Sequence, residues 1–85
     1  MEPIYHRNFK KQLQKLPVKT QDKFEDRIEL FLKNQFHPLL NNHSLTGEYT
    51  GCRSINITGD IRAIFFTKPD TVIFIDIGSH SELYE

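Results

Sequence analysis

The sequence predicts an α+β fold in which an N-terminal strand and an antiparallel helical hairpin pack on a small antiparallel β-sheet. The pattern of apolar residues changes near residue 40. Before this point apolar residues recur at helical spacing, and after it β-branched and aromatic residues form short runs. The length of 85 residues fits one domain, and neither a repeat nor a Gly/Ser-rich linker indicates another. We therefore expect residues 1–85 to form a single domain.

The first forty residues predict one short strand followed by two helices. Pro3 to Tyr5 fits a strand. Apolar residues at i, i+4 and i+7 then give the first helix one apolar face, while lysines occupy the other: Phe9, Leu13 and Leu16. Pro17 ends this helix and can begin the next one, which continues the apolar pattern. Pro38 ends the second helix, because the residue before a proline is forced out of the α region.

The second half of the chain predicts three antiparallel strands joined by tight turns. Residues 37–51 are rich in turn-forming types, and strands follow over 52–57, 61–67 and 71–77. Alternation puts Arg62 on the same face of the middle strand as Ile64 and Phe66, an unusual place for a solvated charge. Both faces of this strand are largely apolar, and a helical hairpin covers only one. We therefore expect a partner protein on the second face.

The composition excludes several classes of protein. The chain has no apolar run near the roughly 18–20 residues of a membrane span, no apolar signal-peptide core, and a single cysteine, Cys52. We therefore expect a cytoplasmic protein that makes no contact with a membrane. The net charge is zero, although five basic residues against one acid give the first twenty residues +4. A phosphate-bearing partner is compatible with this pattern, but bulk polyanion binding is not indicated.

Few residues form a recognisable chemical motif. The four histidines do not have the spacing of a known metal site, and a lone cysteine entering a strand is more often a buried hydrophobe than a nucleophile. The C-terminal segment is more informative, because His80 and Tyr84 lie close together if the tail is helical. The alternative interpretation is a capped terminus in which Leu83 and Tyr84 pack against the sheet.

Three segments together carry a resemblance to a known family. They are Leu45-Thr46-Gly47 with Tyr49 and Gly51, Arg53-Ser54-Ile55 with residues 60–65, and residues 77–84. With the order of helical hairpin, strands and His-x-x-x-Tyr tail, they resemble the RelE/ParE toxin superfamily and, within it, the YafQ-like mRNA interferases. The resemblance spans essentially the whole chain and implies a RelE-like fold.

The resemblance implies a toxin of a type II toxin–antitoxin system, an endoribonuclease that enters the ribosomal A site and cleaves mRNA there. The ribose 2′-hydroxyl would attack the adjacent phosphate, which requires a base, a proton donor for the leaving 5′-oxygen and positive charge at the transition state. No metal or other cofactor is needed for this reaction. The resemblance also implies a cognate antitoxin that neutralises the toxin and through which the complex can reach operator DNA.

Four catalytic positions follow from the resemblance. His80 matches the C-terminal general acid or base, His43 matches a second histidine, and Asp60 matches a functional acid of the YafQ-like group. Arg62 matches a strand arginine of RelE-type members, and its planar guanidinium suits a phosphate clamp. From the residues alone, Asp60 could equally serve its hairpin turn, and His43 could equally be an ordinary loop residue.

The resemblance implies RNA-binding positions as well. Tyr84 would stack on an mRNA base. Arg53 fits a family arginine, although support of the sheet or the loop is an equal interpretation. Lys10 and Lys11 fall on the helix that in relatives carries rRNA-contacting residues, although a solvated helix face is the commoner role.

Two departures from the family pattern leave other functions open. Asn56 stands where the YafQ-like group has another histidine, and an amide cannot exchange protons. The zero net charge is low for a protein that docks in the ribosome. One alternative is a catalytically degenerate module that binds its antitoxin. The other is a ParE-type poison of DNA gyrase, although such poisons generally lack the pair formed by His80 and Tyr84.

Overall fold

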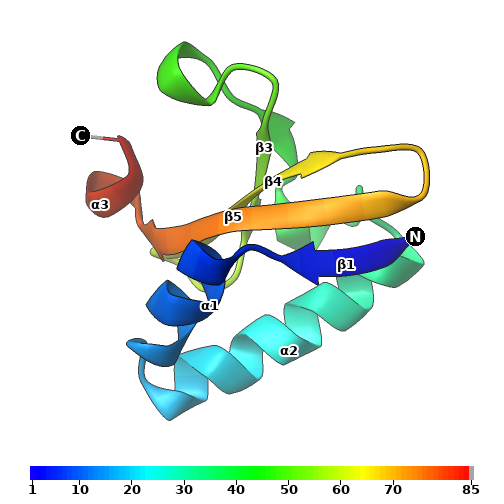
Figure 1. The fold of residues 1–85 in the computed structure, drawn as a ribbon. Helices are drawn as coiled ribbons and strands as arrows, with labels where there is room; N and C mark the ends of the chain where they lie inside the picture. The colour runs from blue at the N-terminus through cyan, green and yellow to red at the C-terminus, as the bar shows by residue number, and fades with distance from the viewer. Residues whose placement is uncertain (85) are drawn as a thin grey trace.

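In a computed structural model, which describes residues 1–84, the two longer helices pack on one face of a single sheet (Figure 1). The helices are α1 (Arg7–Gln14), α2 (Val18–Lys33) and α3 (His80–Tyr84). The strands are β1 (Glu2–Tyr5), β2 (His43–Ser44), β3 (Arg53–Asn56), β4 (Ile61–Thr67) and β5 (Thr71–Ser79). Two 3-10 turns, Pro38–Leu40 and Gly47–Tyr49, flank β2. The predicted α+β architecture is confirmed.

The five strands form one mixed sheet in the order β1-β5-β4-β3-β2. The pairs from β2 to β5 are antiparallel. The short turns predict this for β3, β4 and β5, whereas β2 lies in the turn-rich segment 37–51 and was not predicted as a strand. The opening strand β1 joins the same sheet in parallel with β5, with Ile4 opposite Ile73. The sequence pattern predicted this strand but gave no pairing partner, because its partner lies about seventy residues later in the chain.

The core lies between this sheet and the two longer helices. Phe9 of α1, with Phe24 and Phe31 of α2, is at most 1% exposed. Their rings contact Phe74 of β5 at centroid distances of 5.5, 6.1 and 5.8 Å, respectively. Aromatic pairs at these distances add roughly 0.5–1.5 kcal/mol beyond the burial of their area. The apolar stripes predicted for both helices therefore hold one face of the sheet firmly.

The helix α2 is shorter than predicted and ends at Lys33 instead of before Pro38. Asn34 is extended, with φ −158° and ψ 94°, and its side-chain oxygen accepts a hydrogen bond from the Phe36 backbone N–H at 3.1 Å. Asparagine side chains compete with helical hydrogen bonds in this way. The resulting turn leaves Phe36 61% exposed. Among residues 1–84 no helix, α2 included, is long and apolar enough to cross a membrane.

A β-bulge in β5 changes which of its side chains face the helices. Ile64 of β4 pairs with Asp76, but the next residue, Phe65, pairs with Phe74, so Ile75 is an extra residue. Phe74 belongs to the core, and strict alternation would also direct Asp76 toward the helices. The bulge reverses the alternation and places Asp76 on the opposite face, together with Ile64.

The expectation that a partner protein covers the second face of β4 is wrong at its centre. Ile64 is fully buried within the single chain, and Arg62 and Phe66 are half-buried. The reason is that the chain folds back over this face, since the segment 41–52 and α3 border the sheet on the side away from α2 (Figure 1). The most exposed large apolar side chains lie elsewhere, namely Val18, Phe36, Met1 and Leu39.

Candidate functional site

The segment 43–49 and α3 border a groove on the sheet face opposite the two longer helices. A cavity of about 250 Å³ is lined by His43, Ser44, Leu45, Thr46, His80 and Tyr84. A second hollow of about 460 Å³ shares Thr46 and Tyr84 with the first and adds Gly47, Glu48, Tyr49 and Leu83. We call the two hollows together the groove. Three residues predicted from distant parts of the sequence therefore meet in one place: His43, His80 and Tyr84.

Two glycines shape the segment that forms one wall of the groove. Gly47 and Gly51 have φ angles of +68° and +93°, a region that residues with a side chain rarely adopt. Between them, the Thr50 hydroxyl donates to the Gly47 carbonyl at 2.7 Å, and the Cys52 N–H donates to the Tyr49 carbonyl at 2.8 Å. The wall is therefore a tight turn that carries Tyr49 into the groove.

A capping box forms the start of α3, the other wall. The Glu82 N–H donates to the Ser79 hydroxyl at 3.2 Å, and the Ser79 N–H donates to the Glu82 carboxylate at 2.9 Å. This Ser-x-x-Glu pattern is a recognised helix start in a sequence, and the sequence reasoning overlooked it. The hydrogen bonds from Ser79 lower the pKa of Glu82, so the carboxylate stays ionised in its capping role.

His80, the first residue of α3, is exposed beside the groove. Its ring meets the ring of Tyr84 in an edge-on arrangement, with the centroids 4.7 Å apart. The tail is helical, which was the condition under which these two side chains would lie together. The Tyr84 hydroxyl is buried and finds no hydrogen-bond partner among the described residues 1–84. Leu83, in contrast, packs inward and is 6% exposed.

His43 and Arg62 are in direct contact below the groove. The Nδ1 atom of His43 lies 3.2 Å from Nη2 of Arg62 and 3.0 Å from the Asn41 carbonyl. When Nδ1 carries the proton, it donates to Asn41 and leaves Nε2 as a free base. When Nδ1 is unprotonated, it accepts a hydrogen bond from Arg62 instead. The position therefore suits either tautomer of the imidazole.

Arg62 connects β4 to β3 and to the segment before β2 through neutral acceptors. Its Nε donates to the Ser54 hydroxyl at 2.9 Å, Nη1 donates to the Asn56 side-chain oxygen, and Nη2 donates to the Asn41 carbonyl at 3.1 Å. No carboxylate is among the recorded partners of this guanidinium in the described part of the chain. Its hydrogen bonds are satisfied, but no acid within residues 1–84 is bonded to it to neutralise its positive charge.

Asp60 and Arg53 lie outside the groove lining. Asp60 is exposed in the β3–β4 turn and directly precedes Ile61, which pairs with Ser79, so it lies at the end of the sheet where α3 begins. Arg53 is half-buried, donates from Nε to the Asn42 side chain at 2.8 Å, and lies 5.5 Å from the centre of the Phe36 ring. These contacts favour the supporting role for Arg53.

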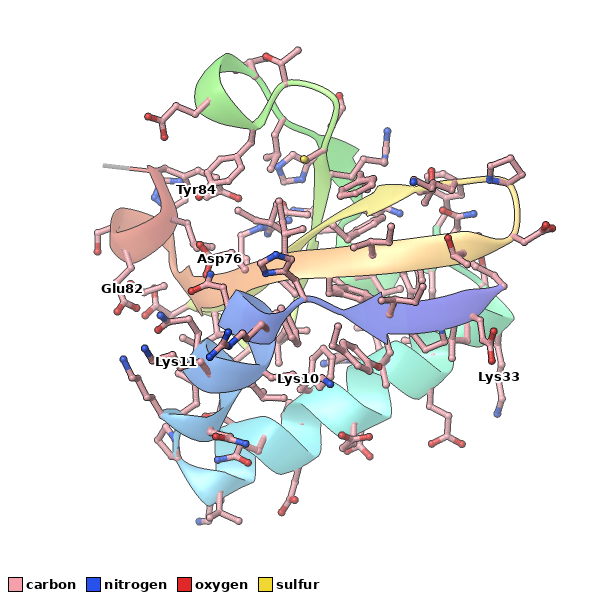
Figure 2. The ribbon with its side chains drawn as sticks, viewed as in Figure 1. Lys10, Lys11, Lys33, Asp76, Glu82 and Tyr84 are labelled. Carbon is pink, nitrogen blue, oxygen red and sulfur yellow. The ribbon has the colours of Figure 1, made fainter. Side chains whose placement is uncertain are left out.

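Lys10 and Lys11 are exposed on α1, in the helical layer on the other side of the sheet from the groove. In Figure 2 both side chains project from α1, whereas Tyr84 lies across β5 from them. The structure therefore does not bring these lysines together with the two histidines of the groove. Any RNA contact that they make is separate from the groove.

Two side chains that sequence reasoning missed also belong to this region. Tyr49 lines the groove, and its ring meets the Tyr84 ring edge-on with the centroids 6.3 Å apart. Burial raises the pKa of Tyr49, and the neighbouring Asp76 carboxylate raises it further. In the sequence, Tyr49 stands out only as part of the family resemblance. The only sign of a special role for Asp76 is that it is an isolated acid in an otherwise apolar strand.

The other chemical candidates gain no support from the geometry. Cys52 is half-buried, and this burial raises the pKa of its thiol, which disfavours the thiolate that a nucleophile needs. Two further histidines act as helix caps, since Nδ1 of His6 accepts from the Asn8 N–H and Nδ1 of His37 accepts from the Leu39 N–H. Residues 1–84 contain no group of three side chains placed to hold a metal ion.

Comparison with known proteins agrees with this architecture. The family model described as "Bacterial toxin of type II toxin-antitoxin system, YafQ" matches residues 1–85. The crystal structure of YafQ from E. coli strain BL21(DE3) superposes with a TM-score of 0.84 and 17% identity, covering 99% of this chain and 98% of that chain. No curated protein sequence matches the chain.

Two further solved structures share the fold. The toxin chain of the E. coli DinJ-YafQ toxin-antitoxin complex gives a TM-score of 0.81 at 18% identity, over 99% of this chain and 97% of that one. A YoeB/ParE toxin from Agrobacterium tumefaciens gives a TM-score of 0.78 at 19% identity, over 94% and 99%. At these identities the superpositions establish the fold, and the family model establishes the family. The chain belongs to the YafQ family of bacterial toxins of type II toxin–antitoxin systems.

Proposed function

We propose that residues 1–85 act as a single-domain, ribosome-dependent endoribonuclease that cleaves mRNA in the A site. The observation that carries this proposal is the meeting of His43, His80 and Tyr84 around one cavity of about 250 Å³, with Arg62 in contact with His43. These groups supply a base, an acid, a stacking ring and a positive charge. A ribosomal target also implies a cytoplasmic location.

The two histidines divide the proton transfers of the proposed reaction. His43 can accept the proton of the ribose 2′-hydroxyl at Nε2 when its Nδ1–H is held by the Asn41 carbonyl. His80 can then protonate the leaving 5′-oxygen from the opposite wall of the groove. Asp60 lies near the start of α3 and would act on His80 through charge. Nothing in this scheme requires a metal ion.

Arg62 would stabilise the negative charge that grows on the phosphate oxygens. Its neutral partners orient the guanidinium without neutralising it, so its field reaches the groove beside His43. This fixed orientation is useful, because a preorganised charge costs no reorganisation when the reaction takes place. The proposed role is therefore long-range electrostatic stabilisation in addition to direct contact with phosphate.

Contacts with RNA would come from two surfaces. Tyr84 offers its ring to an mRNA base in the groove. Lys10 and Lys11 offer exposed positive charge to rRNA on the helical side of the molecule. Arg53 would contribute indirectly, because it holds Asn42 beside His43.

We further propose that a cognate antitoxin neutralises the toxin and connects the complex to operator DNA. The relative YafQ has been solved with the antitoxin DinJ. In this chain, exposed apolar side chains gather within eight residues at the end of α2 and in the turn after it: Leu32, Phe36 and Leu39. An antitoxin segment that covers them would remove apolar surface from water.

Inducible expression with primer extension on a translated reporter mRNA tests the proposed function. We expect growth arrest and codon-phased cuts for the wild type, and neither for His80→Gln. The matched control is His6→Asn, which replaces a histidine outside the groove by another good helix cap and should behave like the wild type. Arrest with cuts that persist in His80→Gln would refute the site. Arrest with DNA damage and no cuts would indicate a gyrase poison.

One observation favours a second candidate function. The Asn56 side-chain oxygen accepts a hydrogen bond from Arg62, and the other hydrogen bonds of this guanidinium are also made within the chain. Such an arginine can serve as a purely structural tie, in which case the chain would be a degenerate module that binds its antitoxin. The distinguishing result is tight antitoxin binding by a chain whose expression never slows growth.

A further inference from the structure

The backbone carbonyl of Asn41 lies where two groups of the proposed site meet. It is 3.0 Å from Nδ1 of His43 and accepts a hydrogen bond from Nη2 of Arg62 at 3.1 Å. These two nitrogens are themselves 3.2 Å apart, so the three atoms form a compact triangle. A carbonyl oxygen has two lone pairs and can accept from both nitrogens at once. The position of this one oxygen therefore affects the histidine and the arginine together.

The direction of this carbonyl depends on an uncommon backbone conformation. Asn41 follows the 3-10 turn Pro38–Leu40 and is left-handed, with φ 43° and ψ 52°. Within residues 1–84 it is the one residue other than glycine with a positive φ. Asparagine tolerates this region better than most residues that have a side chain, and β-branched residues scarcely adopt it. Few residue types at position 41 would therefore aim the carbonyl in the same direction.

Both neighbours of Asn41 are anchored. Leu40 is fully buried in the core. The Asn42 side chain donates to the Gln35 carbonyl at 2.9 Å and accepts from Nε of Arg53 at 2.8 Å. A change in the backbone dihedrals of Asn41 would have to move its carbonyl or break one of these contacts. The turn is thus a rigid support for the carbonyl.

The contacts of His43 alone allow either tautomer, but a count of donors and acceptors selects one. Nη2 of Arg62 carries two hydrogens, and besides the Asn41 carbonyl it donates to the Ser54 carbonyl at 3.3 Å. Both hydrogens are then used, so Nδ1 of His43 receives none. A proton on Nδ1 satisfies this atom, because it then donates to Asn41, whereas without the proton two acceptors would face each other at 3.0 Å. The arrangement in which every group is paired leaves Nε2 unprotonated.

We propose that Asn41 is a positioning residue whose left-handed backbone holds His43 as the Nδ1–H tautomer, with Nε2 free to accept a proton. This inference rests on the proposed function, in which His43 takes the proton of the ribose 2′-hydroxyl. Asn41 acts through its backbone carbonyl and through His43, not on the RNA. The role needs a residue at position 41 that adopts the left-handed conformation, and it does not need the amide side chain.

The test compares Asn41→Gly, which keeps the left-handed conformation, with Asn41→Val, which disfavours it. The first readout is the pair of nitrogen NMR shifts of the His43 ring, recorded at a pH at which the imidazole is neutral, because these shifts distinguish the two tautomers. We expect the Nδ1–H tautomer in the wild type and in Asn41→Gly, and a mixture of both tautomers in Asn41→Val.

The second readout is the cleavage rate in a reconstituted translation reaction. We expect Asn41→Val to slow cleavage by about ten- to hundredfold, as a misplaced catalytic group does, and Asn41→Gly to remain close to wild type. The matched control is Thr67→Val, which introduces the same side chain at the exposed end of β4, where an extended backbone suits it. This control should match the wild type in both readouts.

An Nε2–H tautomer in the wild type would overturn the proposal, and this result requires no variant to fold. A loss in Asn41→Gly as large as that in Asn41→Val would overturn it as well. Denaturant unfolding checks that Asn41→Val is folded, and the less strained Asn41→Ala replaces it if it is not. The tautomer measurement needs no activity. A wild type that cleaves nothing but holds His43 as Nδ1–H, with a changed tautomer in Asn41→Val, would refute the proposed function and support the positioning role.

Discussion

The two faces of the same sheet are built from different kinds of residues. The face toward the helices is apolar and rich in aromatic rings, with Phe65 and Phe74 fully buried. The other face carries Ser54, Arg62 and Asp76. Arg62 donates to Ser54 on the neighbouring strand and to the Asn41 carbonyl, and Asp76 accepts from the N–H of Ile77 in its own strand. The first face stabilises the fold, and the second orients charged and titratable groups. A substitution in the first should lower stability, whereas one in the second should lower activity first.

The largest effect on stability is expected for Phe74→Ala. Phe74 lies at the centre of the aromatic cluster, so its truncation should lower the free energy of unfolding by about 3–5 kcal/mol. Denaturant unfolding measures this change. The exposed Leu39→Ala serves as the control and should stay within roughly 0.5 kcal/mol of wild type. Similar losses in both variants would contradict the assignment of the core to this face.

A smaller loss of stability is expected for Arg62→Met on the groove face. It leaves the buried Ser54 hydroxyl and the Asn56 side chain without their donor, which should cost about 1–3 kcal/mol. Growth arrest should nevertheless disappear completely, because the positive charge beside His43 is lost. The control, Lys68→Met, removes an exposed charge from the β4–β5 turn and should change neither property. Retained arrest in Arg62→Met would show that the guanidinium has only a structural role.

The two faces also differed in how far the sequence could predict them. The helix-side face followed from periodicity, because helix and strand spacings alone assign Phe24, Phe31 and Phe65 to the core. Arg62 was identified as unusual by the same alternation. On the groove face, alternation failed at Asp76, because a one-residue bulge reverses the direction of every later side chain in β5.

The groove could not be predicted from local sequence patterns, because it is formed by contacts between residues far apart in the chain. His43 and His80 are 37 residues apart in the sequence, and only the family resemblance predicted that both serve one site. The resemblance could not reveal that Asn56 and Ser54 hold Arg62, since these contacts depend on the strand register. Local signals were available for α3, where the capping box can be recognised from residues 79–82.

Two serines at the start of α3 differ in their expected effect: Ser79, which precedes the helix, and Ser81, which lies within it. Ser79→Ala removes the cap of this helix and should lower the free energy of unfolding by about 1 kcal/mol, whereas Ser81→Ala should have almost no effect. Because α3 begins at His80, Ser79→Ala should also slow mRNA cleavage. Thermal unfolding and the primer-extension assay measure the two consequences. Equal behaviour of the two serine variants would rule out a role for the capping box.

The smallest expected effect concerns the other half of that capping box and depends on pH. The pKa of Glu82 is lower in the folded chain than in the unfolded one, because Ser79 donates to its carboxylate. Its contribution to stability is therefore fully present above the unfolded pKa of Glu82 and is lost as the pH falls through the folded pKa. Wild type should be more stable than Glu82→Gln at neutral pH, and this difference should shrink as the solution becomes acidic. Denaturant unfolding of both proteins across that range measures the difference. If it stayed constant, the ionised carboxylate would not be what caps α3, and the placement of His80 would depend on Ser79 alone.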